Sequence, residues 1–162
     1  MPLQSASTKP RPAPLLVVPP PLMFAVAFGA GVLLQRFVAL PPAAVADDLT
    51  WVGATVLAVS VCLGLSLAAR FLVRRTTLKP FADPAVLVAG GPYRFSRNPM
   101  YLCLIVAYVG GALMFGSLWP FATLLVPLAV LTRIVVPFEE ARMQAVFGAR
   151  YQDYLSRVRR WL

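Results

Sequence analysis

Long apolar stretches alternate with short polar segments along this chain of 162 residues. Four of these stretches are long and poor in charge, at about residues 15–40, 49–69, 99–116 and 119–137. A helix of about 20 apolar residues crosses the hydrocarbon core of a bilayer, because each residue adds about 1.5 Å. The pattern therefore predicts an all-α integral membrane protein with four transmembrane helices. A short turn at residues 116–120 makes the last two a helical hairpin.

The segments at the two ends of the chain are polar in different ways. Residues 1–14 are rich in Pro, Ser and Ala without any helical period, which predicts a disordered tail and leaves residues 15–162 as a single domain. Residues 137–140 combine a proline with two acids, which is typical of a helix start. From Met143 onward apolar positions recur every three to four residues, which predicts an interfacial amphipathic helix over residues 138–161, bent near Gly148.

Basic residues gather at one side of the predicted spans. The net charge is +9, and Arg70, Arg74, Arg75 and Lys79 follow the second span directly. Such clusters mark cytoplasmic loops, so both termini and the active site are expected in the cytoplasm of a multi-pass protein of a bacterial inner (plasma) membrane. Only Arg36 falls on the opposite side. A signal peptide cleaved after residues 44–46 is the competing interpretation of the N-terminal part.

Composition excludes several classes of function. With 59% hydrophobic residues, the positive charge indicates contact with anionic lipid headgroups, and Arg159 and Arg160 are interpreted in this way; binding to nucleic acid is not expected. The chain has no histidine and only two cysteines, Cys62 and Cys103, both inside apolar stretches. Neither a metal site nor a disulfide framework is therefore predicted.

The run between the second and third spans concentrates unusual residues. It contains Gly90, Gly91 and Pro92, then Tyr93, and then Arg97, Asn98, Pro99 and Tyr101. The glycines allow a close turn, and Asn98 followed by Pro99 predicts a helix that begins with an Asn cap. The hairpin is short for two crossings, so Arg97 and Arg133 should be partly submerged. Arg133 then either pairs with Glu139 or Glu140 or extends to the interface.

Three pieces in this order resemble a known family. The run at residues 90–102, the pair Glu139 and Glu140, and a tail with the pattern Phe147-Gly148-x-x-Tyr151-x-x-Tyr154-x-x-Arg157-Val158 are similar to membrane methyltransferases. These include isoprenylcysteine carboxyl methyltransferase and the phospholipid N-methyltransferases. The resemblance implies binding of S-adenosylmethionine through Arg97, Asn98, Pro99, Tyr101, Glu139 and Glu140. Eukaryotic carboxyl methyltransferases usually have histidine where this chain has Asn98.

The chemistry of the donor agrees with these residue types. Glutamates can accept from ribose hydroxyls or an ammonium group, Gly91 and Tyr93 can shape the turn, and an aromatic ring of Tyr93, Tyr101 or Trp161 can face the sulfonium. A carboxylate acceptor needs no base, only an arginine such as Arg97 or Arg157 to orient it. An ammonium acceptor must first lose a proton, and a glutamate of the pair, Glu140 above all, is the available base.

The sequence thus predicts transfer of a methyl group to a membrane lipid or another amphiphilic or prenylated acceptor, with an isoprenylcysteine-like carboxylate as the first choice. A phospholipid-type N-methyltransferase is the alternative within this class. An NADPH-dependent membrane reductase and a non-enzymatic scaffold are the other possibilities. Under the scaffold hypothesis the two acids are only first-turn residues of a helix, and Tyr151, Tyr154 and Trp161 are interfacial anchors.

Overall fold

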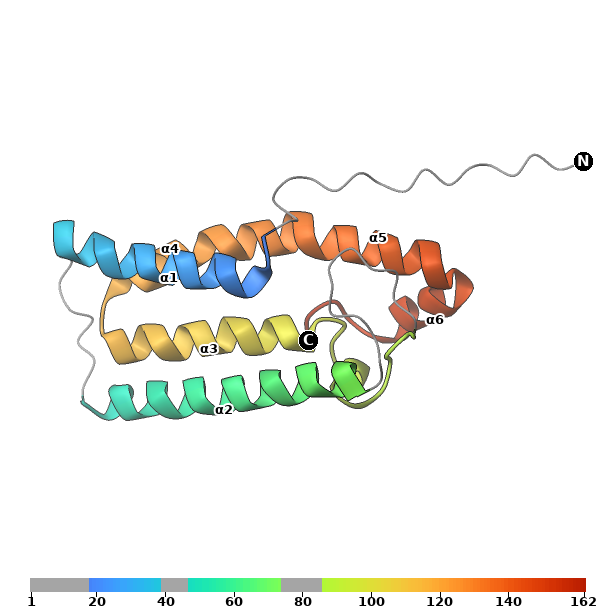
Figure 1. Ribbon diagram of the computed structural model, residues 1–162, viewed down its shortest axis with the longest axis horizontal. Helices are drawn as coiled ribbons and strands as arrows, with labels where there is room; N and C mark the ends of the chain where they lie inside the picture. Colours follow the sequence, from blue (N-terminus) through green and yellow to red (C-terminus); the bar gives the residue numbers. More distant parts are fainter. Residues whose placement is uncertain (1–17, 39–46, 74–85) are drawn as a thin grey trace, which may run out of the picture.

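The computed structural model describes residues 18–38, 47–73 and 86–162, and the predicted tail at residues 1–14 lies outside them. Four helices lie side by side: α1 (Pro20–Phe37), α2 (Asp47–Val73), α3 (Pro99–Phe115) and α4 (Leu118–Val130) (Figure 1). A 3-10 turn, η2 (Gly91–Arg94), precedes α3. A π-helical turn, η3 (Leu131–Val135), joins α4 to α5 (Val136–Phe147), and α6 (Ala149–Arg157) follows. The described part contains no strand, which confirms the all-α prediction.

Three helical segments are long and apolar enough to cross a membrane: Pro20–Phe37, Leu49–Ala69 and Leu118–Phe147. They match three of the four predicted spans. The fourth, α3, begins and ends where the sequence predicts, but it has only 17 residues. Large apolar side chains are exposed on these helices, including Val26, Leu65 and Leu125. Exposed apolar surface of this extent is typical of helices that face lipid; whether α3 makes a fourth crossing stays a prediction.

The chain beyond α4 differs from the expectation in two respects. Residues 137–140 do not start a new helix, because the helix continues from Leu118 to Phe147. The π turn makes this possible: the Val136 amide bonds to the Leu131 carbonyl, five residues back, just before Pro137, which has no amide hydrogen to donate. The expected bend at Gly148 is confirmed, with a φ of +52°. The last helix ends at Arg157 rather than residue 161, and Val158 is extended.

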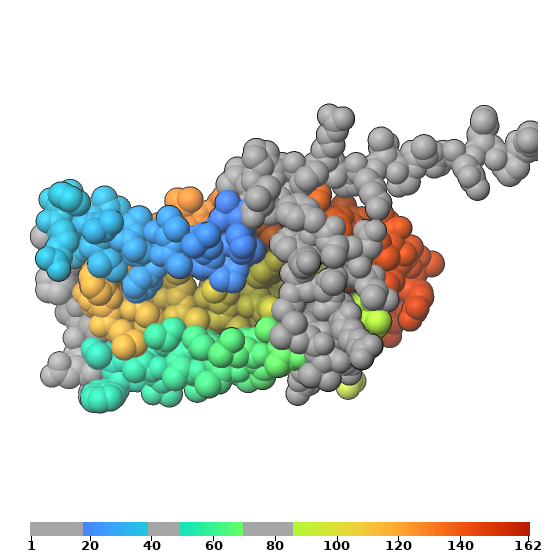
Figure 2. Space-filling view, in the orientation of Figure 1, coloured from blue at the N-terminus to red at the C-terminus, as the bar shows by residue number. Residues whose placement is uncertain are grey.

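Packing within the bundle occurs mainly in two pairs of helices. Glycines let α2 and α3 approach closely, since a Cβ added at Gly110 would lie 2.7 Å from the Leu57 nitrogen and 2.8 Å from the Gly53 oxygen. Helices α1 and α4 make the other close pair, and α3 contacts α4 much less extensively. Figure 2 shows α3 between α1 and α2 on one face of the molecule. The pairing leaves space between α3 and α4 for the groove described below.

Candidate functional site

The loop before α3 positions the first group of predicted site residues. Gly91 has a φ of +63°, a conformation that only glycine adopts readily, and it opens the η2 turn that carries Tyr93. Helix α3 begins at Pro99 with Asn98 at the N-cap position, as predicted. The Asn98 side chain does not cap the helix, however, and its Nδ2 donates to the Arg160 carbonyl at 3.0 Å. Asn98 therefore joins this loop to the segment after α6.

The acidic pair on α5 meets this loop directly. The Tyr101 hydroxyl donates to Glu139 Oε1 at 2.7 Å. Glu140 binds two guanidinium groups, with Arg97 Nη1 3.1 Å from its Oε1 and Arg160 Nη2 2.5 Å from its Oε2. Residues some 40 positions apart in the sequence thus meet at one end of the bundle. We call these five residues, Arg97, Tyr101, Glu139, Glu140 and Arg160, the polar cluster.

The polar cluster is balanced in charge and largely shielded from solvent. It holds two carboxylates and two guanidinium groups, and the side chains of Arg97 and Glu140 are each only 16% exposed. Ion pairs shielded to this degree resist salt, and losing one partner leaves a costly uncompensated charge. The Arg97 Nε is buried and has no hydrogen-bond partner among the described residues. One N–H donor of the polar cluster therefore lacks a partner in the part of the chain that the structure describes.

Three tyrosines outside the spans line the same region. Burial, reinforced by Glu140 and opposed by Arg97, raises the pKa of Tyr151 to about 12. Burial also raises the pKa of Tyr154 to about 12, and its hydroxyl donates to the Tyr93 carbonyl at 2.7 Å. Burial raises the pKa of Tyr93 as well. All three phenols therefore stay protonated near neutral pH, where they offer aromatic faces and O–H donors rather than bases.

The segment after α6, residues 158–162, which we call the strap, crosses back over the loop before α3. The Arg97 amide donates to the Arg159 carbonyl at 3.0 Å, and the Ser96 hydroxyl donates to the Arg160 carbonyl at 3.3 Å. The Asn98 side chain adds a third hydrogen bond to the strap's backbone. The ion pair from Arg160 to Glu140 holds the strap through a side chain as well. These bonds also explain why α6 ends at Arg157 and does not continue to residue 161. The carbonyls of Arg159 and Arg160 accept hydrogen bonds from residues 96–98 instead of from a further helical turn.

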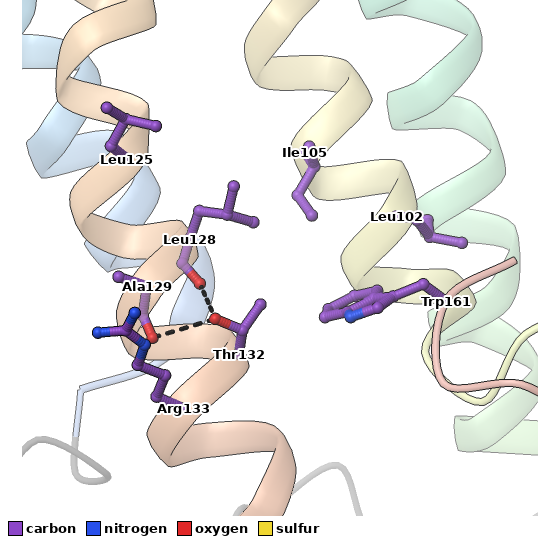
Figure 3. Close-up of a pocket in the computed structure, with 8 residues that line it drawn as sticks. All are labelled: Leu102, Ile105, Leu125, Leu128, Ala129, Thr132, Arg133 and Trp161. Atoms are coloured by element: carbon purple, nitrogen blue, oxygen red, sulfur yellow. Dashed lines mark hydrogen bonds between the residues drawn. The ribbon is translucent and has the colours of Figure 1, made fainter.

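An open groove of about 490 Å³ lies between α3 and α4 (Figure 3). Its walls are mainly apolar and come from both helices, η3 and the strap: Leu102, Ile105, Leu125, Leu128, Ala129, Thr132, Arg133 and Trp161. The Thr132 hydroxyl is already bonded to the carbonyls of Leu128 and Ala129. Arg133 is exposed and has no ion-pair partner in the part of the chain that the structure describes. The groove thus combines an apolar wall with one available cation.

The structure brings most of the predicted site residues together. Tyr101 bonds to Glu139 and Arg97 pairs with the adjacent Glu140, and Gly91, Tyr93, Asn98 and Pro99 lie in the loop that carries Arg97. Arg157 lies elsewhere: it pairs with Asp153, and its side chain is 68% exposed. Arg133 pairs with neither Glu139 nor Glu140, and among the described residues no group of acids or cysteines could hold a metal ion.

Sequence reasoning missed Arg160 as a member of the site, because it was interpreted as a lipid contact. Arg160 lies 20 residues beyond Glu140, in an extended segment where no helical period links the two. A buried carboxylate such as Glu140 needs a cation nearby. Several arginines follow it in the sequence, and nothing in the sequence distinguishes Arg160 from the others as its partner.

Comparison with known families supplies one match. The family model described as phospholipid methyltransferase matches residues 49–150, which run from α2 into the beginning of α6. No curated protein and no solved structure matches the chain significantly.

Proposed function

Since this chain belongs to the phospholipid methyltransferase family, we propose that it transfers the methyl group of S-adenosylmethionine to an amphiphilic acceptor held in the membrane. The observation that carries this proposal is the meeting of the loop before α3 with the acids of α5, directly beside an apolar groove. A polar site for a charged donor next to an apolar site for a lipid chain is what this reaction requires.

The residues present fit such a donor. It carries an ammonium group and ribose hydroxyls, which need acceptors such as the carboxylates of Glu139 and Glu140. It also carries a carboxylate, which suits the guanidinium group of Arg97. Its sulfonium suits an aromatic face, which Tyr93 and Tyr101 offer. We infer that the polar cluster and the loop at residues 91–101 bind the donor.

When bound, S-adenosylmethionine supplies a methyl group that a nucleophilic oxygen or nitrogen of the acceptor displaces in line from sulfur. The protein's contribution is then orientation and exclusion of water. The ion pairs of Glu140 fix the loop before α3 relative to α5. The apolar wall of the groove keeps the acceptor chain in place.

The acceptor that we favour carries a carboxylate, as in an isoprenylcysteine. A carboxylate is a nucleophile at neutral pH without a base. Arg133, exposed in the groove and without an ion-pair partner among the described residues, can orient it. The contacts of Arg157 with Asp153 make it a weaker candidate for this role than Arg97 or Arg133.

A phospholipid amine is the second candidate, and Glu139 favours it. This carboxylate accepts a hydrogen bond from Tyr101, whereas Glu140 binds two guanidinium groups. Glu139 is therefore better able than Glu140 to take a proton from an ammonium acceptor at its second oxygen. The description of the family also fits this acceptor.

Calorimetry with S-adenosylmethionine or its demethylated product tests the donor site. Glu139→Gln and Glu140→Gln should each weaken binding by about tenfold or more, because a charged hydrogen bond contributes roughly 1.5–3 kcal/mol. Asp153→Asn is the matched control, an exposed acid paired with Arg157, and it should leave the affinity unchanged. Unaltered affinity in both glutamate variants would refute the assignment, and binding of NADPH in place of the donor would favour a reductase.

Transfer of a labelled methyl group to two acceptors separates the acceptor classes. One is a farnesylated cysteine derivative and the other is phosphatidylethanolamine in vesicles. Methylation of the first alone supports the carboxylate, and loss of activity in Glu139→Gln with the second alone supports the amine.

A further inference from the structure

We propose that Trp161 determines which acceptor chains the groove admits. The proposal rests on the proposed function insofar as it assigns the groove to the acceptor. It differs from the interpretation of Trp161 as an interfacial anchor or as a face for the sulfonium. The residue would act as a fixed wall that limits how far a hydrocarbon chain extends toward the polar cluster.

The position of the indole is the first argument. Trp161 comes from the strap, yet its ring lies in the groove opposite Thr132, on the side of Leu102 and Ile105 (Figure 3). It also packs against the buried core that includes Leu131 and Val135. A tryptophan that only anchors a protein at the interface keeps its ring at the level of the headgroups rather than among core side chains.

The neighbours of Trp161 supply the second argument. The preceding residue, Arg160, binds Glu140 of the polar cluster through two side-chain contacts of 3.1 and 2.5 Å. One residue of the strap thus reaches the polar cluster while the next reaches the groove. The indole therefore lies at the boundary between the two, where an acceptor chain must end and its reactive group must begin.

The way in which the strap is held gives the third argument. Hydrogen bonds from the Arg97 amide, the Ser96 hydroxyl and the Asn98 side chain fix the carbonyls of Arg159 and Arg160. Withdrawing the strap from the groove would require breaking these bonds and the ion pair, and rotating the indole out of the groove would lose its packing against the core. A side chain that is fixed in this manner can discriminate by size, because it cannot move aside for a longer chain.

Acceptor selectivity provides the direct test. Two acceptors with the same head group are compared, one with a farnesyl and one with a geranylgeranyl chain, in wild type, Trp161→Phe and Trp161→Ala. Trp161→Ala should raise the ratio of kcat/KM for the longer chain over the shorter by about tenfold, and Trp161→Phe by less. Donor affinity by calorimetry should stay within about twofold. An unchanged ratio with intact donor binding would overturn the proposal.

A binding measurement keeps this inference separate from the proposed function. A brominated single-chain amphiphile is titrated into the protein in detergent, and tryptophan fluorescence is followed. Bromine quenches at contact, so wild type should show a saturable component that disappears in Trp161→Phe. Trp51→Phe is the matched control, since Trp51 is 76% exposed on α2, and it should retain that component. Equal quenching in wild type and Trp161→Phe contradicts the inference even if no acceptor is ever methylated.

Discussion

Glu139 and Glu140 are neighbours in the sequence but have different surroundings. Successive residues on an α-helix point about 100° apart, so Glu139 faces Tyr101 on α3 while Glu140 faces Arg97 and Arg160. The first carboxylate accepts from a neutral hydroxyl and also experiences the charge of Arg142, whereas the second makes ion pairs with two guanidinium groups. This difference suggests a division of labour in which Glu140 holds the site together and Glu139 remains available for a ligand or a proton.

Arg160 of the strap and Arg157 at the end of α6 offer a comparison of two paired arginines. Arg160→Gln should lower thermal stability in detergent by several degrees, because Glu140 is only 16% exposed and loses a charged partner. Arg157→Gln should change the melting temperature by less than about 1 °C, since its pair with Asp153 is exposed. Melting followed by circular dichroism measures both. Equal losses in the two variants would show that the contact between Arg160 and Glu140 contributes little.

These two arginines also show what the sequence can predict at this scale. Residues 97–101 carry the local signal of a helix start, and together with the acidic pair they resemble the motif of a known family, so they were recognisable. The second partner of Glu140, Arg160, was not recognisable, because its contact depends on how the strap folds back over residues 96–98. Arg157 was chosen because it fits the repeating pattern of the tail. That pattern reflects the helical period of α6, and it does not indicate which residues reach the site.

The most informative element is the π turn η3. Sequence patterns predicted a new helix at Pro137, because proline usually marks a helix start. A bond from Val136 to Leu131 instead carries the helix through to Phe147. A wider turn of this kind is common at functional sites, and here it includes Thr132 and Arg133 of the groove. Its presence depends on packing against the core through Leu131 and Val135, which the sequence does not specify.

Helix packing can be tested with a pair of glycines in different surroundings. Gly110→Ala should destabilise the bundle by several degrees, because its Cβ would lie 2.7 Å from backbone of α2, which cannot move without separating the helices. Gly29→Ala on α1 is the control: nothing lies within 4 Å, so it should be neutral or slightly stabilising through its helix propensity. Thermal melting in detergent compares them, and a neutral Gly110→Ala would mean that α2 and α3 are less tightly packed.

Over the whole molecule, the start of α3, the η2 loop and α6 lie at one end of the bundle, while the last turn of α1, which contains Arg36, lies at the other (Figure 1). Helix α3, with 17 residues, is about 26 Å long, slightly less than a hydrocarbon core of about 30 Å. Because it packs closely along α2, we expect it to occupy the same depth in the membrane. A site at its start would then lie slightly below the headgroups, where the proposed donor from water and the proposed acceptor from lipid can meet.

Labelling of single cysteines decides whether α3 crosses the membrane. In a background with Cys62 and Cys103 replaced by alanine, Phe37→Cys, 83% exposed at the end of α1, should react with an impermeant maleimide in intact bacterial cells. Ser156→Cys on α6 should react only after the cells are opened, because four crossings return α6 to the cytoplasmic side. With only the three long helices crossing, α6 would lie on the same side as Phe37. Labelling of both cysteines in intact cells would therefore exclude the four-span arrangement, whereas labelling of Ser156→Cys alone would mean four crossings with the polar cluster outside the cytoplasm, away from the cell's supply of the proposed donor.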